Sequence, residues 1–236
     1  ILDAAVENKC KTLDEVKALP LGNGTVQDAV TDRSGITGEK MELDGYNWIE
    51  GAATAIYNHQ GKNALCTIAA FNKPADEKVA HEIVMQIAAM NPIAIDEDGV
   101  SEEIKQKEIQ VAIDKTKAEQ VQKAVEAALK KAGFNLYIAE NEEHLNEGVM
   151  KGNITEAQAE EIRQLKAKVA EEKAANLPAA MIENIAKGRL GKFLKEVCLL
   201  KQEDIMDPKK TVADVLKESD PELKVVDFKR FTLRAE

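Results

Sequence analysis

Aromatic residues are scarce in this sequence, with five Phe, three Tyr and one Trp among 236 residues. Proteins that bind single-stranded nucleic acid usually offer several aromatic rings on which bases stack, so this composition argues against such a surface. The formal net charge of −10 argues the same way, because it opposes binding to phosphate backbones and anionic membranes. We therefore expect no direct nucleic-acid binding, whereas a protein partner is compatible with the composition.

Long hydrophobic runs and paired cysteines are also missing. No segment reaches the roughly 18 continuous apolar residues that a membrane helix needs, so no membrane contact is expected. Cys10, Cys66 and Cys198 are far apart, which favours reduced thiols and a cytoplasmic location. The first residue is Ile and no signal peptide follows it, so we expect the chain to be the remainder of a longer one.

Sequence motifs that would indicate a catalytic or metal site are weak or missing. RSGITGEK is only faintly similar to a phosphate-binding loop, because Lys40 does not directly follow Gly38 and no Ser or Thr follows the lysine. The histidines, His59, His81 and His144, lack the spacing of a zinc site. The many carboxylates occur in runs typical of solvated faces and give an acidic hydrolase little support. We expect no cofactor, no metal and no enzyme activity.

Two β-rich runs and an apolar helix stand out in the first half. ATAIYN and ALCTIAAF are separated by a turn containing Gly61, which predicts an antiparallel hairpin. HEIVMQIAAMNP, residues 81–92, predicts a helix that ends near Pro92, since a residue before proline disfavours the α conformation. Its apolar majority is expected to pack on the protein's own sheet, which leaves Glu82 and Gln86 as a narrow polar stripe.

The two ends of the chain are less regular. Residues 1–19 predict a helix, and residues 20–40, rich in Gly, Thr, Asp and Ser, predict a long loop. The Asp-Gly pair in 41–51 predicts either a hairpin tip or a bent strand. ELKVVDFKRFTL alternates as a strand, and a phase shift between Phe228 and Phe231 indicates a bulge.

The middle of the chain predicts a helical arm. Residues 101–131 lack Gly and Pro, and Ser101 is a good N-cap for one long helix. A second helix is expected from Thr155 to about Asn176, because Thr155 and Gln158 have capping-box spacing. Two such helices joined by a compact tip form an antiparallel arm that often pairs with another arm. The coiled-coil-like positions recur every seventh residue: Ile104, Val111, Ala118 and Val125.

The predicted fold class is α+β, with small antiparallel sheets and packed helices plus a long helical, coiled-coil-like insertion. We assign residues 1–51 to the remnant of a first core subdomain. Residues 52–100 and 180–236 form a second α+β subdomain, and residues 101–179 form the inserted arm. This division follows from strands that flank the helical section on both sides.

Several segments resemble motifs of the bacterial translation elongation factor Ts (EF-Ts) family, in the same order and spacing. ADEKVAHEIVMQIAAMNP is similar to a helix motif close to HIAMHIAA followed by x-P. GRLGKFLKEVCLLKQEDIMDPKKTV is similar to G-R-x-x-K-F-x-x-E-x-x-L-x-x-Q-x-F-V-x-D/E-P-x-x-T-V. VVDFKRFTLRAE resembles the closing F-x-R-F-x-L/V-G-E strand, and ILDAAV and GEKMEL resemble the first core subdomain. The resemblance covers roughly residues 1–110 and 180–236.

The resemblance implies a function without covalent chemistry. EF-Ts proteins bind the GTPase EF-Tu and promote GDP release by preferring its nucleotide-free state. The family's N-terminal helical domain and its Thr-Asp-Phe-Val motif are expected before Ile1. Binding is therefore expected of residues 1–236, and full exchange activity is expected to need those preceding parts. The alternative function is a structural module whose arm mediates self-association, as a homodimer, without exchange activity.

The resemblance also implies the EF-Tu-binding residues. A Val-Met pair that contacts EF-Tu in the family falls at Ile205 and Met206, although an apolar pair in a polar loop can equally serve to anchor the loop. Glu82 and Gln86 fall at the two histidines of HIAMH, and they form either a solvated stripe or a partner-facing one. His81 is a further candidate contact. Two other departures from the family are Asp44-Gly45-Tyr46 for an Arg-Arg pair and Ala235-Glu236 for the final Gly-Glu.

Overall fold

The computed structural model describes residues 1–233, and Ala235-Glu236 of the closing motif lie outside the described residues. The chain divides into two compact units, Ile1–Asp96 with Val197–Glu236, and Glu97–Glu196. Residues 180–196, which the sequence pattern assigns to the second subdomain, thus group with the arm helices. We call the first unit the body and the second unit the arm.

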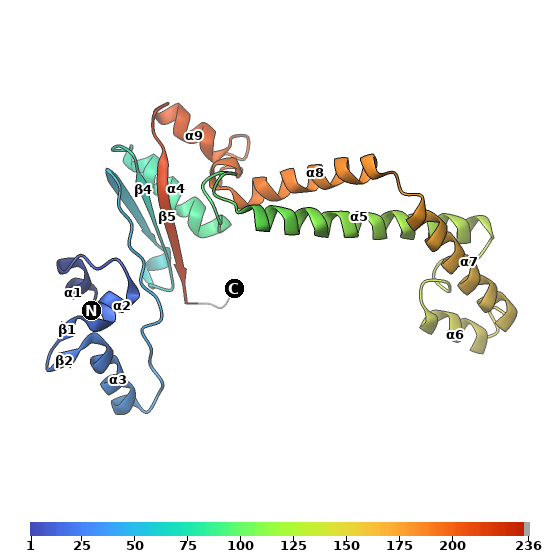
Figure 1. The fold of residues 1–236 in the computed structure, drawn as a ribbon, viewed down its shortest axis with the longest axis horizontal. Coiled ribbons are helices and arrows are strands. Elements are labelled where there is room, and N and C mark those ends of the chain that lie inside the picture. Colours follow the sequence, from blue (N-terminus) through green and yellow to red (C-terminus); the bar gives the residue numbers. More distant parts are fainter. Residues whose placement is uncertain (234–236) are drawn as a thin grey trace. The chain divides into compact units, whose positions relative to one another are not determined.

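The body contains a three-stranded antiparallel sheet in the order β3-β4-β5 (Figure 1). The predicted hairpin and closing strand are confirmed, and with them the α+β class. The bulge lies earlier than expected, because Ala70 pairs with Asp227 and Phe71 with Val225, which leaves Val226 as the extra residue. Beyond it the strand stays in register, so the apolar phase change near Phe231 is not a bulge. The strands are β3 (Ala53–Asn58), β4 (Leu65–Phe71) and β5 (Val225–Thr232).

Helix α4 (Glu77–Met90) covers one face of this sheet (Figure 1). Asp76 caps its first turn by accepting the backbone N–H groups of Lys78 and Val79, and Asn91 ends it in the left-handed conformation just before Pro92. The expected packing of the apolar majority on the sheet is confirmed. The core shared by the sheet and α4 is fully or almost fully buried and includes Ala69, Phe71, Ile83, Val84 and Ile87.

The N-terminal part of the body contains more helix than the sequence suggested. Residues 20–40 were expected to form a loop, yet α3 (Val26–Thr37) occupies most of this range. Thr25 and Asp28 form a reciprocal capping box and Gly38 ends the helix in the left-handed region, so end signals rather than an apolar stripe define it. Residues 41–51 form no strand. The remaining elements of the body are α1 (Leu2–Glu7), α2 (Leu13–Ala18), β1 (Pro20–Leu21), β2 (Gly24–Thr25) and α9 (Val212–Ser219).

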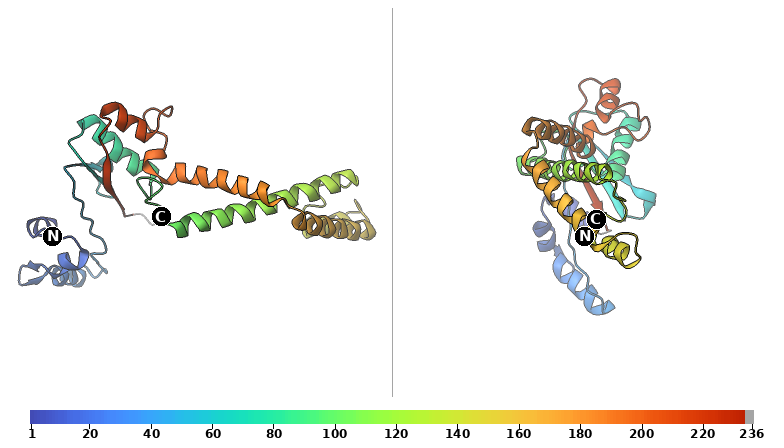
Figure 2. Two further views of the ribbon diagram at one scale, coloured as in Figure 1. Left: turned by 45° about the horizontal axis from the view of Figure 1, so that its top comes forward. Right: turned by 90° about the vertical axis from the view of Figure 1, so that its right-hand side faces the viewer.

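The arm consists of four helices, of which α7 packs along the C-terminal part of α5 and α8 runs beside the N-terminal part (Figure 2). The two predicted arm helices and their caps at Ser101 and Thr155 are confirmed. A compact apolar cluster holds the tip. The expected seventh-residue seam is only partly buried, because Val111 is half exposed whereas Val125 is buried. The helices are α5 (Glu102–Lys131), α6 (Glu142–Met150), α7 (Glu156–Ala175) and α8 (Ala179–Val197).

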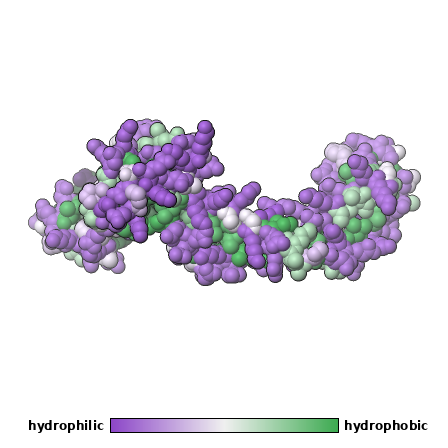
Figure 3. All heavy atoms as spheres, turned by 90° about the horizontal axis from the view of Figure 1, so that it is seen from above, coloured by the Kyte–Doolittle hydropathy of each residue, from purple (hydrophilic) through white to green (hydrophobic). Residues whose placement is uncertain are grey.

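The surface carries small apolar patches among many charged residues. The face shown in Figure 3 is mainly hydrophilic, with hydrophobic residues gathered in separate areas. Within residues 1–233, no helix is both long enough and apolar enough to cross a membrane.

Candidate functional site

Three of the predicted contact residues lie around one hollow of the body, of about 520 Å³. His81 and Glu82 reach it from α4, and Met206 reaches it from the loop formed by residues 202–207, which we call the Met206 loop. The side chain of Met206 is 68% exposed, and that of Ile205 is half-buried. Folding thus brings together residues that are more than a hundred positions apart. The other residues that line the hollow are Glu77, Lys78 and Met85.

The position of Gln86 differs from the one predicted from the sequence. Its side chain is fully buried, so the expectation that it lies on an exposed stripe with Glu82 is wrong. Its amide nitrogen donates to Gln202 Oε1 and to the carbonyl of Glu203, both at 3.1 Å, and its amide oxygen accepts the backbone N–H of Ile205 at 2.9 Å. Because these bonds fix the Met206 loop against α4, Gln86 acts as a positioning residue.

Asp204 gives the Met206 loop its local shape. Its carboxylate Oδ2 accepts the backbone N–H groups of Met206 at 3.0 Å and Asp207 at 2.7 Å. Its own backbone N–H donates to the carbonyl of Lys210 at 3.0 Å. These bonds turn the chain sharply, and Met206 is left pointing outward. The Ile-Met pair therefore divides into a half-buried Ile205 and an exposed Met206.

Glu82 and Asp204 form a carboxyl pair beside the hollow. Burial raises the pKa of Glu82 above its ordinary value of 4.5, and the hydrogen bond and negative charge of Asp204 raise it further. Lys210 and Lys78 act in the opposite direction. Sequence reasoning missed Asp204, although a signal was available, since this residue stands where the family motif has Phe while Glu82 stands at a histidine.

His81 of α4 lines the hollow and also contacts the sheet. The ring is exposed and meets Tyr57 of β3 edge-on, with ring centroids 5.6 Å apart. Tyr57 in turn shares a hydrogen bond with His59 Nδ1 at 2.8 Å. An aromatic contact therefore holds the His81 ring at the edge of the hollow.

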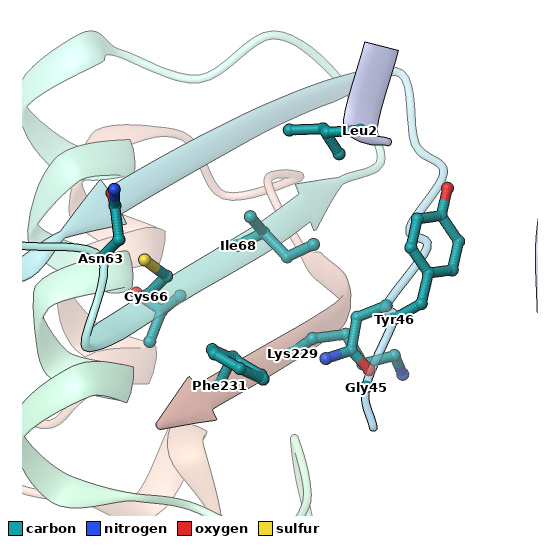
Figure 4. Close-up of a pocket in the computed structure, with 10 residues that line it drawn as sticks. Leu2, Gly45, Tyr46, Asn63, Cys66, Ile68, Lys229 and Phe231 are labelled. Carbon is teal, nitrogen blue, oxygen red and sulfur yellow. The ribbon is translucent and has the colours of Figure 1, made fainter. Parts of the chain in front are cut away.

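A second hollow, of about 370 Å³, lies on the sheet face opposite α4 (Figure 4). Cys66, Ile68 and Phe231 contribute apolar atoms from β4 and β5, and Leu2 and Tyr46 contribute from the N-terminal part. Tyr46 is fixed by donating its hydroxyl to the carbonyl of Cys10 at 2.9 Å. Among the residues that line this hollow only Lys229 is charged, so its surface is mainly apolar.

The segment with a faint resemblance to a phosphate loop has a different structure. Residues up to Thr37 belong to α3, and Lys40 pairs with Glu42 at 2.9 Å. Over residues 1–233, no three His, Cys, Asp or Glu side chains are grouped so that they could hold a metal ion.

This fold and surface are those of a small α+β protein with a helical insertion and an exposed apolar and acidic surface suited to contact with another protein. A family model described as elongation factor TS matches residues 1–235. The chain is 70% identical to elongation factor Ts of Bacteroides thetaiotaomicron and 72% identical to that of Phocaeicola vulgatus. Both matches cover all of this chain, and 72% and 71% of the respective relatives. Elongation factor Ts of Porphyromonas gingivalis is 35% identical, with 66% of its length covered.

The chain therefore belongs to the elongation factor Ts family and is a translation elongation factor. The family match also covers residues 111–179, where the sequence motifs gave no resemblance.

Proposed function

We propose that this chain binds the translational GTPase EF-Tu and promotes release of its GDP, as a guanine-nucleotide exchange factor. Family membership supports the proposal. The observation that carries it is the Met206 loop, which Gln86 holds so that an exposed methionine stands beside His81 and Glu82. An exposed, adaptable apolar side chain within a fixed polar frame is suited to protein recognition.

Exchange of this kind requires no bond to be made or broken by the exchange factor. A protein that prefers nucleotide-free EF-Tu must lower the affinity of EF-Tu for GDP by the same factor. The proposal accordingly includes no enzyme activity and no cofactor or metal of the chain's own. It places the action in the cytoplasm, where translation takes place, without direct contact to nucleic acid or membrane.

The direct test measures release of fluorescent GDP from EF-Tu, together with a pull-down of nucleotide-free EF-Tu. We expect this chain to bind nucleotide-free EF-Tu and to accelerate release of GDP, with the relative from Bacteroides thetaiotaomicron measured beside it. Failure to capture nucleotide-free EF-Tu, under conditions in which the relative does so, would contradict the proposal.

Met206 offers the sharpest single-residue test. Because its side chain is 68% exposed, Met206→Ala should leave the body folded and weaken EF-Tu binding by about 1 kcal/mol or more. The double variant with Ile205→Ala should weaken binding further, with some loss of stability from the half-buried isoleucine. Met150→Ala is the matched control, because Met150 is 88% exposed on α6 of the arm. Equal affinity of the Met206 variant and this control would remove Met206 from the binding surface.

A second candidate function is self-association through the arm without exchange activity. Ile104 and Val111 of α5 support it, because they are 40% and 50% exposed on a helix that otherwise carries many charges. Analytical ultracentrifugation of the chain and of Val111→Lys tests it directly. A monomer at every concentration measured would rule out the arm as a dimerisation element.

A further inference from the structure

A buried carboxylate oxygen without a hydrogen-bond donor lies next to the hollow. Asp204 is 2% exposed, and its Oδ2 accepts two backbone N–H groups of the Met206 loop. Its Oδ1 is buried and has no hydrogen-bond partner among the described residues. Buried polar atoms in native proteins are almost always satisfied, so an exception calls for a physical reason.

The neighbour of this carboxylate is another acid. Glu82 of α4 lies within hydrogen-bond reach of Asp204, but an ionised carboxylate has no hydrogen to donate. Two carboxyl groups this close are stable together only when they share a proton or when a cation joins them. Burial, and after it the hydrogen bond and negative charge of Asp204, raise the pKa of Glu82, which favours the first of these two states.

The positively charged side chains of this chain neutralise the negative charge of the Glu82–Asp204 pair only in part. Lys210, which follows the Met206 loop, acts on Glu82, but its ammonium group is already paired with Glu218 at 2.6 Å. Lys78 and His81 belong to α4 and line the hollow, and Glu77 adds a further negative charge there. The hollow therefore has an acidic corner at Glu82, and the buried carboxylate of Asp204 lies behind Glu82 rather than in the lining.

The rest of the hollow is lined by apolar atoms of Met85 and Met206. An acidic corner beside flexible thioether side chains matches the two parts of a lysine or arginine. The aliphatic stem of such a residue covers apolar surface while its charged end reaches the acids. Charge complementarity thus identifies the kind of side chain that fits.

We propose that this hollow receives a lysine or arginine side chain of the protein partner, with its cation against Glu82 and its stem against Met85 and Met206. The inference rests on the proposed function, because it specifies the partner chemistry at the same surface. In the free chain the shared proton serves as the donor between the two carboxyl groups, and the incoming cation takes its place at Glu82.

Proton release on binding follows from this exchange of cation for proton. In the free chain, Glu82 keeps its proton to a higher pH than an ordinary carboxyl group, because its pKa is raised, and beside a cation it loses that proton. Each binding event therefore releases up to one proton. Affinity rises as the pH rises from the ordinary value of 4.5 through the raised pKa of Glu82.

Calorimetric titration of nucleotide-free EF-Tu tests this inference. Titrations at mildly acidic pH, in two buffers with different ionisation enthalpies, count the protons released. The variants are Glu82→Gln and Asp204→Asn, in which the new amide can donate to the remaining carboxyl group. We expect unchanged or higher melting temperatures at neutral pH, about tenfold weaker binding and loss of the proton release.

Glu203→Gln is the matched control, because it removes a negative charge from an exposed side chain one residue away from Asp204. The inference is overturned if Glu82→Gln and Asp204→Asn bind EF-Tu as well as the control does. It is also overturned if their affinity falls only in proportion to a fall in melting temperature. In either case the proposed function stands, because the unmodified chain still binds EF-Tu. If the unmodified chain does not bind EF-Tu at all, both proposals fail.

Discussion

The Met206 loop of the body and the tip of the arm are both held by buried side chains, but of different chemical kinds. Two buried amides, Gln86 and Gln202, fix the loop through directed hydrogen bonds. The tip is held mainly by apolar packing, in which Leu145 and Ile162 are fully or almost fully buried. Hydrogen bonds specify orientation, whereas apolar burial is non-directional. The loop is therefore held in one orientation, with Met206 exposed, whereas the tip is a compact apolar cluster with ion pairs at its surface.

Leu145→Ala should produce the largest effect on the tip. The side chain is fully buried, so its removal should cost about 3 kcal/mol of local stability through lost burial and a new cavity. Hydrogen exchange should show faster exchange in α6 and the adjoining part of α7, while β4 and α4 stay protected. Under the proposed function EF-Tu affinity is unchanged. Equal loss of protection in the sheet would show that tip and body unfold together, and the two regions could then not be treated as separately stabilised.

Gln86→Leu should have the next largest effect, and on the loop. The substitution keeps roughly the same volume but leaves the N–H of Ile205 and the carbonyl of Glu203 without their present partner, at a cost of about 2 kcal/mol. Urea unfolding measures this loss, and EF-Tu affinity should fall because the Met206 loop is no longer held. Gln122→Leu is the control, since Gln122 is exposed on α5 and its side chain donates to nearby Glu126. Similar stabilities for the two variants would mean that the amides do not hold the loop.

The parts of the fold that could be predicted from the sequence are those defined by signals within a few neighbouring residues. The ends of α5 and α7 were predictable because Ser101 and Thr155 are caps that act within three residues. Helix α3 was missed because it lacks an apolar stripe and depends on the Thr25–Asp28 capping box and on Gly38. The hairpin of β3 and β4 was likewise predictable from a local signal, whereas the local signals for a bulge near Phe231 and for a turn in residues 41–51 were misleading.

The site was predictable only in part. Met206 and His81 could be placed on one surface by the family resemblance, and both do line the hollow. The burial of Gln86 could not be foreseen from helical periodicity, because its partner Gln202 lies 116 residues away in the sequence. The pairing of Glu82 with Asp204 is likewise long-range, and only a joint departure from the two family motifs signalled it.

The pH dependence of stability provides the smallest and most selective difference between loop and tip. The pKa of Glu82 is raised in the folded chain, so the folded state holds this proton more tightly than the unfolded state does. The resulting stabilisation is complete below the ordinary value of 4.5 and is lost as the pH rises through the raised pKa. The free energy of unfolding of the unmodified chain, relative to Glu82→Gln, should therefore decrease over that range. Urea unfolding of both proteins, with Glu203→Gln as the reference, measures this difference. A difference that is constant with pH would mean that Glu82 and Asp204 share no proton.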